Sequence, residues 1–490
     1  MDLGVDTQSI LSERTRPDRQ VMKQTLVLNV VGLTPALLPS ATHLSRLAAR
    51  GGMRPITTVT PAVTTTVQST FLSGLMPQEH GIIGNGWYFR DLAEVLFWRQ
   101  SNRLVAGEMV WDAAKRRDRE FTCAQLFWWY NMYASVDWSV TPRPLYPADG
   151  RKLPDLYSEP QELRHDLQRQ LGQFPLFHFW GPAADISSSR WISNCALDVL
   201  KRFKPTLTLV YLPHLDYNLQ RLGPADPRIR RDVEQVDQLC GELIEAAGGV
   251  GAHVVVLSEY GITSVSRAIH INRYLRQAGY LRVREELGRE QLDPGASRAF
   301  AVADHQIAHI YVRDAVDVAE VSKLVQQIPG VECVLGDEGK RQYHLNHERS
   351  GELVAIAEAD SWFTYYHFLD DNRAPDFART VDIHRKPGYD PVELWIDPSL
   401  RAPKLRIMTR LLRKRLGMRY LMDVISLDAT LVKGSHGRRT DRAEDGPLLI
   451  TSAPEFLGDG PIEATAVKAL LLNHIFGPSQ SSHGLAKVLT

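Results

Sequence analysis

Three apolar, β-rich runs most strongly limit the folds open to this chain, because each is typical of a buried strand. The runs are 25–33, 207–212 and 253–261. Strands made almost continuously of Val, Leu and Ile are characteristic of parallel sheets covered on both faces. Asp216 follows the second run and Glu259 ends the third, and ligands collect at the carboxyl edge of such sheets. The sequence therefore predicts an α/β fold with a mainly parallel sheet and a functional site at that edge.

Helical patterns alternate with these runs, as expected for βα units. Thr42 is predicted to cap a helix that Gly51-Gly52 ends. The segment 265–360 has a mixed α/β pattern that could extend the same sheet. The remaining predicted helices are 108–115, 188–203, 227–247, 271–278 and 316–328, and further strands are predicted at 122–128, at 306–312, near Val331, near Leu353 and at 447–452.

The chain is predicted to have one core with two insertions. We expect an N-terminal extension at 1–24, a core at 25–475 and a C-terminal tail at 476–490. An aromatic-rich passage at about 87–181 and a charged, turn-rich passage at about 362–422 interrupt the core. Aromatic residues at this density favour a lid or subdomain over a base-stacking platform, because no regular basic residues are interleaved with them.

The charge balance makes a nucleic-acid or anionic-membrane partner less expected. Lys plus Arg and Asp plus Glu both number 57, so the formal net charge is zero. The basic run at 404–419 is interpreted as a solvated helix face rather than a phosphate or membrane patch. We therefore expect a small phosphorylated molecule as partner, and the sequence does not predict an oligomeric state.

Cysteine usage and hydropathy favour a cytoplasmic location. The four cysteines are far apart and form no C-x-x-C pair, which is atypical of a zinc ribbon or a disulfide scaffold. The first 24 residues show no apolar core of signal-peptide length. The apolar runs are too short to span a bilayer, so no membrane span is expected.

A threonine-rich stretch, 61–85, is the strongest candidate for chemistry. Thr64, Thr65 and Thr66 are poor helix formers and good caps, so a helix should begin after them and end at Gly74. Its free N–H groups would face an anion placed at this turn. A hydroxyl there can attack phosphorus if a metal or a base lowers its pKa. The alternative is a threonine turn that only caps a helix.

Several motifs together resemble the alkaline phosphatase superfamily, and within it the type I phosphodiesterase/nucleotide pyrophosphatase group. The run 73–82 is similar to T-G-x-x-P-x-x-H-G-I, Gly223-Pro224 completes a D-x-x-x-H-x-x-G-P-like motif, and 434–437 matches a late G-x-H-G motif. The resemblance implies an alkaline-phosphatase-like core in which two zinc ions lie beside a Thr or Ser nucleophile. It implies the following roles: Thr64 as nucleophile, Asn85 as phosphate-binding residue, and Asp216 and His436 as metal ligands.

Four ligand positions depart from the family pattern. Val31 stands for an Asp, Gln220 for a His, and Glu259-Tyr260 for an Asp-His pair. A two-zinc site is therefore not expected; Glu259 and, more weakly, Gln220 would favour Mg²⁺ or Mn²⁺, or a single ion. Nearby histidines could substitute, although each is more typical of a structural role. They are His214, a weak candidate that shares a face with Asp216 if the strand persists, and His270, His305, His309 and His384.

The expected function is a metal-dependent hydrolase or transferase that acts on a phosphodiester or alkyl phosphate. One or two divalent ions (Zn, Mn or Mg) would assist Thr64. Thr64, Asp216, Glu259 and His436 should converge at one edge of the sheet. Two alternatives stay open: a catalytically silent relative that binds a phosphorylated metabolite or a partner protein, and a phosphonate or sulfate-ester hydrolase. The sulfatase version is weakened because the C/S-x-P-x-R setting is missing.

Overall fold

The central sheet places three parallel strands at the middle of the molecule. The computed structural model describes residues 22–149 and 151–478. β1 (Thr25–Val30) lies between β8 (Leu207–Leu212) and β9 (His253–Leu257), and it pairs with both in parallel. These are the three strands predicted from the apolar runs. All six residues of β1 and of β8 are buried, as the apolar content of the two runs requires.

The sheet has nine strands in the order β21-β2-β20-β9-β1-β8-β5-β6-β7. β5 and β6 continue the parallel pairing, whereas β7, β20 and β2 introduce antiparallel neighbours. β5 to β7 come from the passage at 87–181, so part of the expected insertion pairs with the main sheet; the domain division itself stays a proposal. The bounds are β2 (Gly52–Thr57), β5 (Cys123–Leu126), β6 (Trp138–Pro142), β7 (Leu156–Glu159), β20 (Leu448–Thr451) and β21 (Ile462–Glu463).

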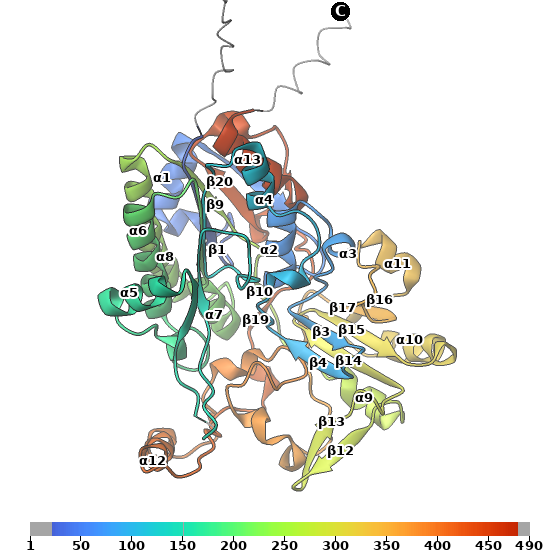
Figure 1. Cartoon of the computed structure of the whole chain (residues 1–490). Coiled ribbons are helices and arrows are strands. Elements are labelled where there is room, and N and C mark those ends of the chain that lie inside the picture. Colours follow the sequence, from blue (N-terminus) through green and yellow to red (C-terminus); the bar gives the residue numbers. More distant parts are fainter. Residues whose placement is uncertain (1–21, 150, 479–490) are drawn as a thin grey trace, which may run out of the picture.

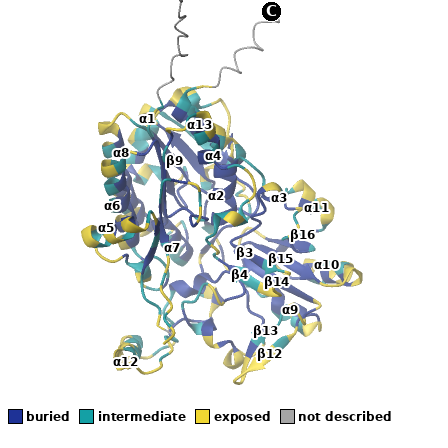
Figure 2. Cartoon of the chain, viewed as in Figure 1, coloured by how far each residue is buried: buried dark blue, intermediate teal, exposed yellow. Residues whose placement is uncertain are grey.

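Helices cover both faces of this sheet, which confirms the predicted fold class (Figure 1). Figure 2 shows dark blue strands at the centre with partly exposed helices outside them. The apolar side chains that the helices turn inward complete one large core with the strands. One face carries α1 (Thr42–Arg50), α6 (Ile186–Phe203) and α8 (Ile229–Gly249), and the other carries α2 (Thr64–Ser73), α4 (Val110–Arg117) and α13 (Val467–Phe476).

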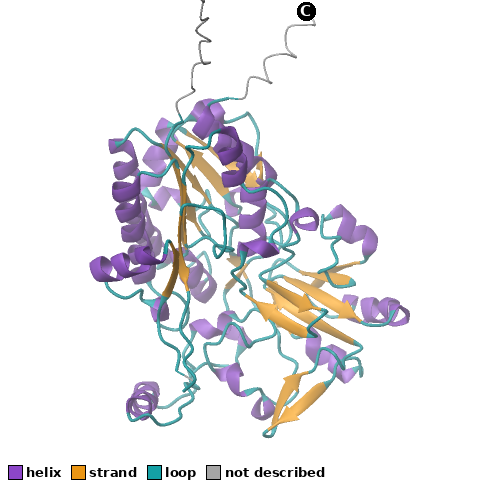
Figure 3. Cartoon of the chain, viewed as in Figure 1, coloured by secondary structure: helices purple, strands orange, loops and turns teal. Residues whose placement is uncertain are grey.

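A second, smaller sheet lies beside the first (Figure 3). The segment that could have extended the main sheet forms instead an antiparallel sheet of its own, with its own apolar core. The strand order is β14 (Ala299–Asp304), β15 (Ile307–Val312), β17 (Leu353–Ala357) and β16 (Val331–Leu335), with α9 (Ile271–Gln277), α10 (Val318–Gln326) and α11 (Asp337–Gln342) alongside.

Short elements complete the described chain. The antiparallel pairs are β3 (Gly86–Phe89) with β4 (Glu94–Phe97), β10 (Thr263–Ser264) with β19 (Gly434–Ser435), and β12 (Val283–Glu286) with β13 (Arg289–Leu292); β11 (Arg267–Ile269) pairs in parallel with β18 (Ser361–Phe363). The remaining helices are α3 (Pro77–His80), α5 (Gln161–Leu171), α7 (His214–Leu222) and α12 (Pro403–Arg415).

Two local predictions about helix starts and strand ends are wrong. The chain does not stay extended through Asp216, because α7 begins at His214, directly after Pro213. Residues two apart on a helix lie about 200° apart around its axis, so His214 and Asp216 do not share a face. Thr42 does not cap α1 either: it is the first helical residue, and Ala41 holds the N-cap position.

Membrane-spanning helices are not found among residues 22–149 and 151–478, where no helix combines sufficient length with sufficient apolar character. The predicted N-terminal extension and C-terminal tail lie largely outside the described residues.

Candidate active site

Thr64 is the first residue of α2 and is buried beneath the carboxyl edge of the sheet. Val63 holds the N-cap position and is in extended conformation, so the helix begins at Thr64. The prediction that it begins after Thr64, Thr65 and Thr66 is wrong. A valine side chain cannot accept a capping hydrogen bond. Gly74 ends the helix in the left-handed conformation (φ 73°), which confirms the predicted stop.

Asn85 is hydrogen-bonded to the first turn of α2. Its Oδ1 accepts from the backbone N–H of Thr65 at 3.1 Å, and the Thr65 hydroxyl donates to the Gly84 carbonyl at 2.8 Å. Asp304 holds the other side of Asn85, accepting from the backbone N–H at 2.7 Å and from Nδ2 at 3.1 Å. Burial raises the pKa of Asp304 to about 6, against the lowering effect of the Asn85 backbone hydrogen bond. Asn85 is thus held beside the first turn of α2, which Thr64 begins.

A chain of two hydrogen bonds links Thr64 to Asp216 through Tyr260. The Thr64 and Tyr260 hydroxyl oxygens are 3.1 Å apart, and the Tyr260 hydroxyl donates to Asp216 Oδ1 at 3.3 Å. Tyrosine has one proton, so the Thr64 hydroxyl is the donor in the first bond. Burial raises the pKa of Asp216 to about 7, although the hydrogen bonds from Tyr260 and Gln220 oppose the shift. Asp216 is therefore a proton acceptor suited to neutral pH.

One carboxyl oxygen of Glu259 accepts hydrogen bonds from two side-chain amides. Its Oε1 accepts from Asn29 Nδ2 and from Gln68 Nε2, both at 2.6 Å. The residue is fully buried, and burial raises the pKa of its carboxyl to about 8 despite these hydrogen bonds. In the structure Oε1 of Glu259 is a hydrogen-bond acceptor for two amides, and its role as a metal ligand stays a prediction.

Four aromatic rings stack across the site. Tyr260 lies flat on His436 with ring centroids 3.6 Å apart, His436 lies 3.7 Å from His305, and His305 lies 3.7 Å from Tyr389. The Nδ1–H of His436 donates to the Ala62 carbonyl at 2.8 Å. Burial holds the pKa of both histidines well below the usual value, so both imidazoles are neutral.

Gln220 supports Asp216 from the same face of α7. Its Nε2 donates to Asp216 Oδ2 at 2.9 Å, as expected for side chains at positions i and i+4. The Gln220 amide and the Tyr389 hydroxyl are also in hydrogen-bond contact at 3.0–3.1 Å. Gln220 is therefore engaged as a hydrogen-bonding partner of a carboxylate, where the resemblance implies an imidazole ligand.

Of the other candidate histidines, His305 alone joins the ring stack. His214 faces α8, with Nε2 at 3.2 Å from Gln235 Oε1 and 3.4 Å from Asp232 Oδ1, so it is not placed as a partner of Asp216. The rest contact their own surroundings: His270 contacts Thr364, His309 contacts the Ile83 carbonyl, and His384 lies at the cavity wall near the Phe97 carbonyl.

The donor set does not fit a zinc pair. Zinc sites use Cys, His and carboxylate ligands that converge within about 2.0–2.3 Å of the ion. Within the described parts of the chain, no three His, Cys, Asp or Glu side chains are grouped so that they could hold a metal ion. The Tyr260 hydroxyl lies between Thr64 and Asp216, and Oε1 of Glu259 accepts hydrogen bonds from two side-chain amides. Dependence on a divalent metal stays a prediction.

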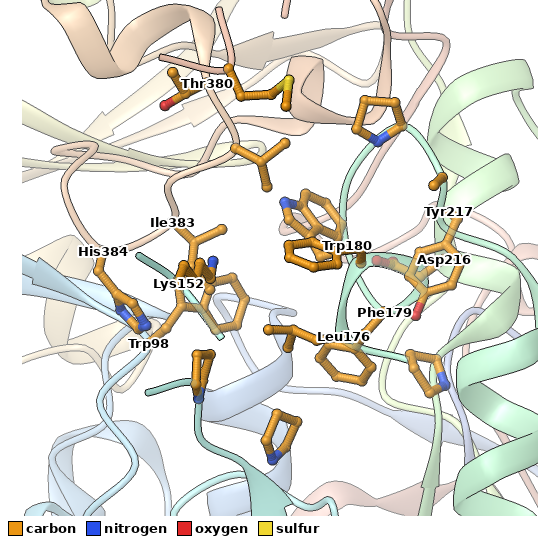
Figure 4. Close-up of a pocket in the computed structure, with 18 of the residues that line it drawn as sticks. Trp98, Lys152, Leu176, Phe179, Trp180, Asp216, Tyr217, Thr380, Ile383 and His384 are labelled. Atoms are coloured by element: carbon orange, nitrogen blue, oxygen red, sulfur yellow. The ribbon is translucent and has the colours of Figure 1, made fainter. Parts of the chain in front are cut away.

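A large aromatic cavity opens onto Thr64. Its volume is about 710 Å³, which suits a small organic ligand. Figure 4 shows Phe179, Trp180 and Tyr217 near Asp216, with Trp98, Lys152 and His384 across the cavity from them. Thr64, Tyr260, His305 and His436 also line it. The cavity is mainly apolar with a few basic groups, Arg143, Lys152 and Lys414.

Asp304, Asn29, Gln68 and Tyr389 were not singled out from the sequence, whereas His305 was named among the histidines that could substitute for a metal ligand. The hairpin β14–β15 has a two-residue turn, and it carries His305 into the ring stack at φ 62°. The dipeptide Asp304-His305 at a strand end was the available signal. Asn29 was another, because an amide inside an otherwise apolar central strand needs a buried partner. Gln68 and Tyr389 gave no local signal, since their partners lie far away in the sequence.

Comparison with known proteins identifies the family. The sequence model described as type I phosphodiesterase / nucleotide pyrophosphatase matches residues 25–390. The chain belongs to this family. A curated protein of Schizosaccharomyces pombe, described as an uncharacterized pyrophosphatase/phosphodiesterase, is 26% identical over 216 residues. That match covers 42% of this chain and 37% of the relative, so the chain spans less than two thirds of the relative's length.

Solved structures of similar fold agree with the family. Phosphonoacetate hydrolase from Sinorhizobium meliloti, in complex with phosphonoformate, has a TM-score of 0.59 at 17% identity, over 93% of this chain and 96% of that chain. Murine ectonucleotide pyrophosphatase/phosphodiesterase 5, an inactive variant in complex with AMP, has a TM-score of 0.54 at 14% identity, over 92% and 94%. At these identities the similarity shows the fold, and it confirms the alkaline-phosphatase-like architecture.

Proposed function

We propose that the protein is a phosphoric ester hydrolase or transferase in which Thr64 is the nucleophile. The observation that carries this proposal is the chain of hydrogen bonds from Thr64 through Tyr260 to Asp216 at the wall of the cavity. Membership of the phosphodiesterase/pyrophosphatase family supports the reaction class. The inactive murine neighbour, in which a threonine is replaced by alanine, supports a threonine at the centre of the chemistry.

The proposed first step transfers the phosphoryl group to Thr64. The Thr64 oxygen bonds to phosphorus while the bond from phosphorus to the leaving oxygen breaks. The Thr64 proton passes to the Tyr260 oxygen as the Tyr260 proton passes to Asp216. The leaving oxygen takes a proton from water, and the hydroxide left in solvent is neutralised by the proton that the second step releases. The α2 N-terminus and the second N–H of the Asn85 amide would stabilise the charge on the phosphoryl oxygens.

The second step returns the enzyme to its starting state. Water bonds to phosphorus, the bond from phosphorus to Thr64 breaks, and one water proton is released to solvent. The proton on Asp216 returns through Tyr260 to Thr64. The step needs no residue beyond those of the first step, because the same three side chains run it in reverse. An alcohol in place of water would make the reaction a transfer.

The cavity supports an organic ester rather than inorganic pyrophosphate. Its apolar and aromatic wall would bury the organic group, and its basic residues Arg143, Lys152 and Lys414 would attract a negatively charged part. We therefore infer that the substrate is a phosphodiester or alkyl phosphate with a bulky apolar or aromatic group.

The expected cytoplasmic location stays a prediction.

A metal is not given a role in these steps. Of one metal-ligand set that the family resemblance implies, Asp216 and His436 are kept, and Gln220 could add a weak oxygen ligand. The geometry described above does not fit a zinc pair. Addition of Mg²⁺, Mn²⁺ or Zn²⁺ in turn to the assay would test whether a single ion, as the sequence suggested, contributes.

A catalytically silent phosphate-binding protein is the second candidate. The observation that favours it is the replacement of strong ligands by Val31, Gln220 and Tyr260, with the Tyr260 hydroxyl between the nucleophile and Asp216. In that case the cavity would bind a phosphorylated metabolite or partner without turnover. The family scaffold is compatible with either outcome.

The test is turnover of chromogenic phosphodiesters and alkyl phosphates by the wild-type protein and by Thr64→Ala. We expect the variant to lose turnover by about 10³-fold or more, because removing the attacking group removes the covalent route. Its unfolding free energy should fall by only about 1 kcal/mol, the worth of one hydrogen bond. Full activity of Thr64→Ala would contradict the mechanism, and an inactive wild-type protein that binds phosphate esters would favour the silent alternative.

A further inference from the structure

The segment 401–421, which contains α12, exposes the densest group of large apolar side chains on the described molecule. Every one of the 13 residues of α12 is at least partly exposed to solvent. Figure 1 shows α12 projecting from the body, and Figure 2 shows it mostly yellow and teal. Seven large apolar side chains in this segment are exposed by 41% to 65%: Leu405, Met408, Leu411, Leu412, Leu416, Met418 and Leu421.

The exposed apolar residues form a stripe along one side of the helix. Leu405, Met408, Leu412 and Leu416 follow one another at spacings of three, four and four, which places them on one face. A second face, with Ile407, Leu411 and Lys414, lines the aromatic cavity. The stripe is therefore not the side by which the helix packs on its own protein.

Basic residues flank the stripe. Residues 401–420 contain eight basic and no acidic side chains, in a chain whose formal net charge is zero. Arg406 and Arg410 form ion pairs with Asp423, and these ion pairs tie the helix to the chain that follows it. The other basic residues are Arg401, Lys404, Arg413, Lys414, Arg415 and Arg419.

We propose that residues 401–421 are a docking surface for a lipid bilayer that contains anionic phospholipid. An apolar face bordered by Lys and Arg is the pattern of helices that lie in the plane of a membrane interface. The Leu and Met side chains would enter the boundary between headgroups and acyl chains, while the basic side chains contact lipid phosphates. The sequence alone suggested a solvated helix face, and the exposed apolar stripe is the feature that revises this interpretation.

Other occupants fit the surface less well. A nucleic acid would match the charge but not the apolar stripe. A second copy would bring two strongly basic surfaces together, even with Arg406 and Arg410 paired to Asp423. A protein partner that wraps around a basic amphipathic helix needs access to all sides of that helix. Two sides of α12 are already engaged, one by the ion pairs with Asp423 and one by the cavity wall. A bilayer needs one face only.

Docking would place one wall of the cavity close to the membrane. Ile407, Leu411 and Lys414 belong both to α12 and to the cavity wall. A phosphate ester with an apolar group partitions into lipid, so the docked protein would meet its substrate there. This consequence rests on the proposed function, whereas binding to the bilayer does not.

The experiment is co-flotation of the full chain with vesicles of phosphatidylcholine, with and without phosphatidylserine. We expect flotation with the phosphatidylserine vesicles, little with phosphatidylcholine alone, and a loss of binding as salt is raised. The variant Arg413→Glu/Arg415→Glu should bind about tenfold or more weakly. Leu412→Ser/Leu416→Ser should lose a similar factor or more through the apolar contribution.

Matched controls separate location from composition. Arg46→Glu/Arg50→Glu makes the same charge change on α1, and Leu287→Ser/Val316→Ser removes two exposed apolar side chains elsewhere. Both should float like the wild-type protein. The α12 variants should retain turnover of a soluble chromogenic ester, and Thr64→Ala should float normally without turnover, so failure of docking and failure of the catalytic proposal are distinguishable.

The proposal is overturned if both α12 variants float as the wild-type protein does, or if the wild-type protein floats equally with and without phosphatidylserine. The proposal is also overturned if the wild-type protein does not float and the surface has another occupant. That occupant is a nucleic acid if an oligonucleotide binds, a helix-wrapping protein if calmodulin binds, or a second copy if the chain self-associates. In each case the α12 variants should abolish the interaction. Circular dichroism melting of each variant establishes that its fold is intact.

Discussion

The two sides of the site have diverged from the family pattern to different degrees. On the side of the proposed nucleophile, Thr64 and Asn85 stand at the sequence positions that the resemblance implies, and hydrogen bonds to Thr65 and Asp304 hold Asn85 beside the first turn of α2. On the ligand side, Val31, Gln220 and Tyr260 stand where strong metal ligands are expected. The backbone scaffold is shared by both sides, so what differs is the chemistry of the side chains. In the proposed mechanism, the site keeps its attacking group while the means of activating that group changes.

The ligand side is filled by hydrogen-bonded and stacked groups. Tyr260 spans from the end of β9 to both Thr64 and Asp216, and its ring is supported by His436. Burial keeps the pKa of Tyr260 well above its ordinary value, so the phenol keeps its proton and can relay one. Each proton that leaves Thr64 thus has a direct route to a carboxylate.

The largest expected effect within this comparison is that of Tyr260→Phe. The substitution keeps the ring on His436 but removes the oxygen between Thr64 and Asp216. We expect kcat to fall by about 10²-fold with KM changed by no more than about threefold, because a proton route is lost while the cavity stays intact. Steady-state kinetics with a chromogenic ester measures both.

Tyr389→Phe is the matched control. It removes a hydroxyl from the other end of the ring stack, where the partner is Gln220. Its kcat should fall by less than about tenfold, as expected for a positioning residue. Equal losses in the two variants would mean that Tyr260 supports the stack and does not relay a proton.

A smaller effect is expected from restoring a ligand with Gln220→His. The change adds an imidazole beside Asp216 and near the ring stack that contains His436, as the resemblance implies. Zinc affinity should rise by about tenfold, measured by calorimetric titration. The exposed Gln277→His variant controls for adding a histidine anywhere. Unchanged affinity at position 220 would show that the two sides differ in backbone geometry as well as in side chains.

The fold was predictable where local patterns decide it. β8 was predicted at its observed bounds, because a short run rich in β-branched, aromatic and aliphatic residues between turn residues has the length and composition of a buried strand. α7 was not, because it begins directly after β8 and the intervening Pro213 is also compatible with a turn. The separate second sheet was not predictable either, since strand pairing between distant segments leaves no local signal.

The site was predictable where motifs are local in sequence. Thr64 and Asn85 lie within one stretch of chain, and a hydrogen bond from the Thr65 N–H to Asn85 brings Asn85 to the first turn of α2. The ring stack depends on His305, which a hairpin from the second sheet brings to His436. The buried surroundings that raise the pKa of Asp216 and Glu259 also come from several distant segments. Such long-range contacts determine the electrostatics and are invisible to a motif.

The most direct test of the account is metal content measured together with turnover. Freshly purified protein would be analysed by mass spectrometry for zinc, manganese and magnesium, treated with a chelator, and assayed with a chromogenic phosphodiester before and after. The account predicts one tightly held ion or none per chain, and turnover by protein that holds no zinc pair, because Thr64, Tyr260 and Asp216 supply the proton route themselves. Two tightly held zinc ions per chain, with turnover that chelation abolishes and zinc restores, would contradict it.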